Sequence, residues 1–123
     1  MLFTLACWLG VATVMAQRPM ENLGRGVVAI HRDDGKVFVS WRLLGTDAEE
    51  IAFNLYRTRG DEAPVKLNSQ PIRNATCFTD DRPNLDRAAA YVVRPLLNGR
   101  EQEPGTPYKL ASNAAVRPFL SVP

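Results

Sequence analysis

The sequence predicts an all-β fold, an antiparallel β-sandwich of six or seven short strands. Apolar residues recur at every second position in several segments, and Asp-Gly or Asn-Gly pairs separate neighbouring segments. Nine prolines and eight glycines punctuate the 123 residues, and no long segment carries the spacing of an amphipathic helix. A chain of this size with 46% hydrophobic and 23% charged residues forms one globular domain.

The first two strands are expected to form a hairpin. Residues 27–30 are β-prone, residues 37–43 alternate between apolar and polar, and Asp34-Gly35 between them tolerates the positive φ of a tight turn. The face of the second strand that packs inward is expected to carry Val37, Val39, Trp41 and Leu43.

Further strands are expected at intervals of roughly ten residues, as in a β-sandwich. The run 51–57 alternates, with Ile51, Phe53 and Leu55 on one side. The run 86–90 is too short for a helix and leads directly into a strand pattern. Shorter strand candidates are residues 65–67, 76–79, 91–94 and, after the turn signal Asn98-Gly99, 100–103.

One late tyrosine narrows the prediction to a fibronectin type III-like (immunoglobulin-like) sandwich. Tyr91 opens a strand and Leu85 lies six residues before it, the arrangement of a tyrosine corner in which the phenol bonds to upstream backbone. Trp41 is the core aromatic residue of an early strand. We expect Trp41, Leu85 and Tyr91 to belong to the structural core.

Residues 1–16 form an uncharged apolar run that ends in small residues and predicts a signal peptide. The run lacks Lys and Arg, so a signal anchor or a wrongly assigned start codon is the alternative, but it is short for a membrane span. Cleavage after Ala16 predicts a secreted chain, extracellular or periplasmic, with no membrane segment. Cys7 leaves with the signal peptide, and Cys77 is expected to be a small buried residue rather than a reactive thiol.

Catalytic and metal-binding patterns are nearly absent. His31 is the sole histidine and is expected in the hairpin turn as a solvated residue, so no Ser-His-Asp, Cys-His or zinc set is assembled around it. Asp80-Asp81 is expected to be a hydrated turn, with a weak calcium contact as the alternative. The net charge of +2, with Lys and Arg spread along the chain, argues against nucleic acid as a partner.

Three blocks of sequence suggest a family. They are RPMENLGRGVVAI at 18–30, VFVSWRLLGTD at 37–47 and IAFNLYR at 51–57, with weaker similarity at 66–68, 71–72 and 98–99. In this order and spacing they resemble the start of the mature rhamnogalacturonan lyases of polysaccharide lyase family 11.

The resemblance implies a fibronectin type III-like module without catalytic residues. In that family a calcium-dependent β-propeller follows the module and cleaves the pectin rhamnogalacturonan I by β-elimination. We expect a signal peptide at 1–16, the sandwich at 17–106, and a linker at 107–123 toward a propeller that is absent, so that the chain is a fragment or a truncated product. No cofactor is expected in this chain, because the calcium belongs to the propeller.

The expected partner is that propeller, and the outward apolar residues Phe38, Leu44 and Tyr56 are expected to mark the docking face. The alternative is a free-standing extracellular carbohydrate-binding or adhesive sandwich, with pectic polysaccharide as the partner and outward aromatic residues stacking on sugar. A lyase activity of this chain alone is disfavoured, since β-elimination needs a base and a stabilising cation in one cleft.

Overall fold

The structure of the chain, a computed structural model, describes residues 23–119. The predicted signal peptide, residues 1–16, lies outside the described residues. Within them every regular element is a strand, and no helix occurs that is long and apolar enough to cross a membrane. The described strands are β1 (Val28–His31), β2 (Val37–Ser40), β3 (Ala52–Thr58), β4 (Val65–Lys66), β5 (Ile72–Arg73), β6 (Cys77–Asp80), β7 (Ala89–Leu97), β8 (Arg100–Glu101) and β9 (Tyr108–Leu110).

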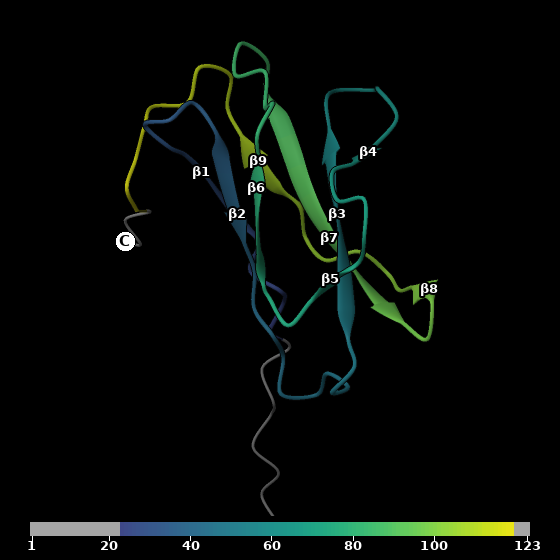
Figure 1. Cartoon of the computed structure of the whole chain (residues 1–123). Helices are drawn as coiled ribbons and strands as arrows, with labels where there is room; N and C mark the ends of the chain where they lie inside the picture. The colour runs from purple at the N-terminus through teal and green to yellow at the C-terminus, as the bar shows by residue number, and fades with distance from the viewer. Residues whose placement is uncertain (1–22, 120–123) are drawn as a thin grey trace, which may run out of the picture.

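Two antiparallel sheets pack against each other, which confirms the predicted sandwich (Figure 1). Sheet A has the strand order β1-β2-β6. Sheet B has the order β4-β3-β7-β8, with β5 also pairing β3 and β9 also pairing β7. Its long central pair, β3 and β7, runs in register from Ala52 opposite Leu96 to Thr58 opposite Ala90.

Both predicted hairpins form, with different turns. The β1–β2 turn is centred on Asp33 and Asp34, and Gly35 alone takes a positive φ of 76°. The β7–β8 turn has two residues, Asn98 and Gly99, with φ values of 51° and 76°, which is the two-residue turn that fits the twist of a hairpin.

The core lies between the sheets and follows the alternation along the strands. Its largest fully buried side chains are Tyr91, Phe53, Leu55, Val37, Val39 and Val93. The Trp41 ring meets the Phe53 ring edge-on, with 5.5 Å between centroids and 67° between planes. Leu85 is half-buried against this cluster. Trp41 and Tyr91 are thus core residues, and Leu85 packs at the margin of the core.

Two residues face the opposite way from our expectation. Leu43 is 62% exposed, because β2 ends at Ser40 and the strand alternation does not continue into the loop that follows. Cys77 is exposed rather than buried, because Phe78, the next residue of β6, takes the inward position and sends Cys77 to the outer face.

The sandwich also extends beyond the expected boundaries. β5 was not expected, and β7 begins two residues before Tyr91. β9 lies inside 107–123, the range that we expected to be a linker, and it pairs with the first residues of β7. The folded part therefore continues past residue 106.

Candidate functional surfaces

One buried ion pair closes the end of the sandwich where the chain enters β1. Arg25 donates two hydrogen bonds to Asp47, Nη1 to Oδ2 at 2.5 Å and Nη2 to Oδ1 at 2.6 Å, and both side chains are nearly buried. The Arg25 guanidinium also lies 5.1 Å from the centre of the Phe53 ring. Together with the Leu44 N–H at 2.7 Å, Arg25 lowers the pKa of the Asp47 carboxyl. The pair therefore fixes the loop between β2 and β3.

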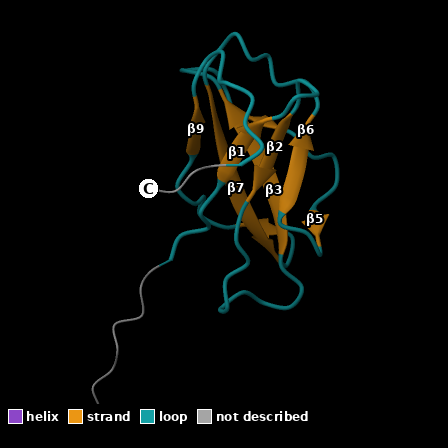
Figure 2. Ribbon diagram, turned by 90° about the vertical axis from the view of Figure 1, so that its left-hand side faces the viewer, coloured by secondary structure: helices purple, strands orange, loops and turns teal. Residues whose placement is uncertain are grey.

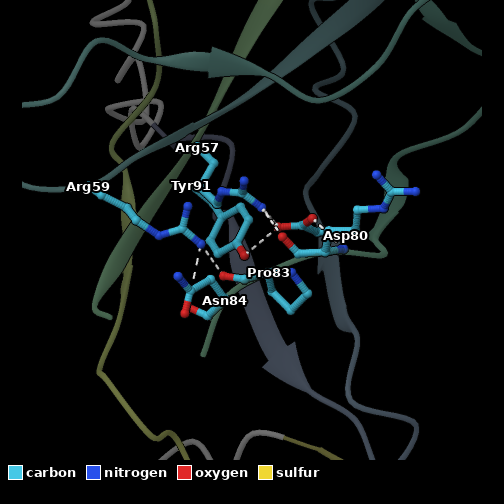
Figure 3. Close-up of polar contacts among 7 residues, drawn as sticks. Arg57, Arg59, Asp80, Pro83, Asn84 and Tyr91 are labelled. Atoms are coloured by element: carbon cyan, nitrogen blue, oxygen red, sulfur yellow. Dashed lines mark hydrogen bonds and ion pairs between the residues drawn. The ribbon is translucent and has the colours of Figure 1, made fainter. Parts of the chain in front are cut away.

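A second buried cluster links the two sheets at the opposite end (Figure 3). Arg57 of β3 donates to Asp80 Oδ2 of β6 at 2.5 Å, and the Tyr91 hydroxyl of β7 donates to the same oxygen at 2.9 Å. Arg59, the residue after β3, donates to the carbonyls of Pro83 and Asn84, which the chain reaches after β6. Burial, followed by the Asp80 charge, raises the pKa of Tyr91 far above its usual range.

This cluster corrects the expected tyrosine corner. The Tyr91 phenol does bond upstream, but to the Asp80 carboxylate rather than to backbone. Asp80 Oδ1 also accepts from the backbone N–H of Arg82 at 3.2 Å, so both of its oxygens have protein partners. The neighbouring Asp81 pairs with Lys36 at 3.1 Å. Asp80 is therefore buried rather than hydrated as expected, whereas the Asp81 side chain is exposed.

The described residues bring together no cluster of metal-binding side chains. No group of three or more His, Cys, Asp or Glu side chains that could hold a metal ion occurs among residues 23–119. His31 is half-buried at the end of β1, not solvated in the turn as expected, and its Nδ1 lies 2.7 Å from the Ala114 carbonyl oxygen. The contact with Ala114, in the segment after β9, accounts for the half-buried position of the His31 side chain.

The outer face of sheet B is occupied by its own polar network. The Tyr56 hydroxyl and the Asn54 amide both donate to Glu101, which lowers the pKa of Glu101 and raises that of Tyr56. The Arg94 guanidinium lies 5.6 Å from the centre of the Tyr56 ring. Asn68 accepts from the backbone N–H of Leu55 and donates to Asn54, each at 2.8 Å. One face of the Tyr56 ring is thus covered by protein.

The outer face of sheet A combines apolar side chains with Ser40 and Thr79, and within residues 23–119 it has no such network. Ile30 of β1 and Phe38 of β2 are register partners on this face, and both are half-buried. Figure 2 views this side and shows the segment after β9 passing in front of β1 and β2. A half-open hollow of about 560 Å³ lies between the segment and the sheet. Its lining residues are Ile30, Arg32, Asp33, Phe38, Val116, Arg117 and Pro118.

The three expected docking residues do not share one face. Phe38 points outward from sheet A, Tyr56 points outward from sheet B, and Leu44 is half-buried in the loop between β2 and β3. Alternation within each strand indicated that Phe38 and Tyr56 face outward, but it could not indicate that their strands join different sheets. The buried ion pairs were missed altogether, because their partners lie 22 and 23 positions apart in the sequence.

Comparison with known proteins identifies the family. Residues 18–110 match the model described as "Rhamnogalacturonan I lyases beta-sheet domain". The chain is 39% identical over 108 residues to rhamnogalacturonan endolyase YesW of Bacillus subtilis (strain 168), covering 88% of this chain and 15% of that protein. It is 40% identical over 87 residues to rhamnogalacturonan exolyase YesX of the same strain, covering 71% of this chain and 13% of that protein.

The solved structures support the fold. A structure described as "Myokine structure" superposes with a TM-score of 0.57 at 13% identity, covering 72% of this chain and 94% of that one. At this identity the similarity concerns the fold alone. The match of residues 18–110 includes every described strand, so the family module and the sandwich coincide. The chain belongs to the rhamnogalacturonan I lyase family through its β-sheet domain.

Proposed function

We propose that this chain is the non-catalytic accessory module of a secreted rhamnogalacturonan lyase that degrades rhamnogalacturonan I by β-elimination. The observation that carries the proposal is coverage: the chain matches a β-sheet domain and spans only 15% and 13% of the length of the two relatives. On this proposal the base, the charge-stabilising group and any calcium belong to the other part of the lyase, and the module stabilises that part.

The placement of the charged side chains supports this role. The two most buried carboxylates, Asp47 and Asp80, are each held by an arginine at 2.5 Å. A general base for β-elimination needs a carboxylate or another base that is free to take a proton from the substrate. Held in ion pairs, these groups stabilise the sandwich rather than serve that purpose.

The experiment has two arms. The full chain is incubated with rhamnogalacturonan I, and the unsaturated uronate that β-elimination creates is followed by its ultraviolet absorbance. No product is expected, and product formation would overturn the non-catalytic role. In the second arm the matched segment is removed from YesW, and a lower melting temperature of the remainder is expected. An unchanged melting temperature would contradict the stabilising role.

A second candidate is a free-standing carbohydrate-binding or adhesive sandwich. The observation in its favour is the outward Tyr56 with Arg94 beside it, an aromatic ring and a cation that suit an acidic sugar. Titration of the full chain with rhamnogalacturonan I oligosaccharides separates the candidates. Saturable binding that Tyr56→Ala abolishes supports the second candidate, and no binding at millimolar ligand contradicts it.

A further inference from the structure

The two outer faces of the sandwich differ in whether their side chains form hydrogen bonds with one another. On sheet B the outward groups bond to one another, as Tyr56 and Asn54 do to Glu101. On sheet A the outward side chains Ile30 and Phe38 offer no hydrogen bond, and the polar Ser40 and Thr79 lie beside Phe38 on the same face. An apolar patch with polar residues around it is typical of a contact surface.

The segment after β9 enlarges this apolar surface. It is fixed to β1 at two points, since Arg117 N donates to the His31 carbonyl at 3.0 Å and His31 Nδ1 meets the Ala114 carbonyl at 2.7 Å. From there it carries two apolar side chains that are open to solvent, Val116 at 50% and Phe119 at 68% exposure. Arg32 and Arg117 line the rim of the hollow between the segment and Phe38.

We propose, resting on the function proposed above, that the outer face of sheet A together with residues 114–119 is the surface that packs against the remainder of the lyase. We call it the sheet A surface. It comprises Val28, Ile30, Phe38, Val116, Pro118 and Phe119.

The path of the chain indicates which occupant fits. The segment after β9 passes over the outer face of sheet A, so a polypeptide that continued from it would start beside this face (Figure 2). A short connection to a following domain would give that domain a high effective concentration at this face. The matched part is only 15% of YesW, so most of the length of such a lyase is available as the partner. The segment leaves β9, at the edge of sheet B, and crosses to β1 and the outer face of sheet A.

Cys77 provides a direct probe of this surface. It is a free, exposed thiol on the outer face of β6, paired in register with Ser40 of β2. Through Ser40 it lies in the same outward row as Val28 of the sheet A surface, so a domain that covers this face is expected to slow its alkylation. The matched control is Lys66→Cys, because Lys66 is exposed and lies opposite Tyr56 on the outer face of sheet B.

The experiment compares the full chain alone with the full chain fused in place of the matched segment of YesW. Iodoacetamide modification of the peptide containing Cys77 is followed by mass spectrometry. We expect Cys77 to react with iodoacetamide about tenfold or more slowly in the fusion than in the chain alone, as for a site that is open a tenth of the time or less. We expect the cysteine of the Lys66→Cys variant to react at the same rate in the fusion and in the chain alone. Phe38→Ser is expected to restore the rate at Cys77 in the fusion.

Equal rates at Cys77, or protection at Lys66→Cys alone or at both sites, would overturn the assignment of the sheet A surface. If the fusion does not fold, the same comparison is made in intact YesW with a cysteine at the position that aligns with Cys77, against YesW cut after the matched segment. The failure of the proposed function is separate: it shows as an unchanged melting temperature when the matched segment is deleted, whatever the labelling rates.

Discussion

Replacing Asp47 by asparagine tests whether burial gives the Arg25–Asp47 pair its importance. The structure provides a control with the same contact distance: Arg25–Asp47 and Arg87–Glu62 both have N–O distances of 2.5 Å. Their exposure differs, with side chains 10% and 7% exposed in the first pair and 51% and 57% in the second. Asp47→Asn leaves the Arg25 charge buried without a counter-charge, whereas Glu62→Gln leaves Arg87 in water.

The expected magnitudes follow from that difference. Removing one partner of a buried pair costs about 3–5 kcal/mol, and an exposed pair contributes about 1 kcal/mol or less. A domain of this size has a total stability of about 5–15 kcal/mol, so Asp47→Asn removes a large share of it. With an m-value of about 2 kcal/mol/M, the urea midpoint falls by roughly 1.5–2.5 M for Asp47→Asn and by about 0.5 M or less for Glu62→Gln.

The assay is urea unfolding of the full chain, followed by circular dichroism. The double variant Arg25→Met, Asp47→Asn completes the cycle, and it is expected to lose much less stability than the two single variants added together, because no buried charge is left unpaired. Equal midpoint shifts for Asp47→Asn and Glu62→Gln would refute the argument from burial. Additive losses in the double variant would refute the direct coupling of Arg25 to Asp47.

Three further predictions concern stability. Tyr91→Phe removes a donor to a buried carboxylate and is expected to cost about 1.5–3 kcal/mol, whereas Tyr56→Phe, at the surface, costs less than about 1 kcal/mol; urea unfolding distinguishes them. Gly26→Ala is expected to lower the melting temperature, because Gly26 has a φ of 57° and a Cβ there would meet an arginine side chain at 3.1 Å; the control Gly45→Ala, with open space and an ordinary φ, leaves it nearly unchanged. The pKa of Asp47 is lower in the folded protein than its ordinary value of 3.8, so the ionised carboxylate stabilises the fold at pH values above 3.8, and this stabilisation is lost as the pH falls through the lower folded pKa. Asp47→Asn is therefore expected to make the stability of the protein fall less steeply with decreasing pH. An unchanged fall would contradict this.

The parts of the fold that the sequence could predict are those with a local cause. The turns at Gly35 and at Asn98-Gly99 were predicted because positive φ favours these residue types, and both turns form. Trp41 was predicted to be buried from its phase with Val37 and Val39, and it is. Local alternation identifies the packed face of a strand where several apolar residues agree on it.

The misses have non-local or ambiguous causes. In residues 76–79 the order of polar and apolar residues does not indicate which side chains of the strand point inward. Only the inward position of Phe78 in the structure shows that Cys77 faces solvent. β9 does carry an alternating signal, with Tyr108 and Leu110 both half-buried, but the resemblance to the lyases implied a linker at 107–123. Arg25 stood between two glycines with nothing nearby to indicate that its partner is a carboxylate in a distant loop.

The position of the buried charges bears on where the function of this module resides. Arg25–Asp47 closes one end of the sandwich, and Arg57, Asp80 and Tyr91 link the two sheets at the other. Residues 23–119 hold one cysteine and so have no disulfide of their own to link the sheets. The charged groups at both ends are thus engaged in holding the fold together. What remains for recognition is the pair of outer faces. We assign the interdomain contact to the sheet A surface because its side chains Ile30 and Phe38 are apolar, whereas the outward groups of sheet B are hydrogen-bonded to one another.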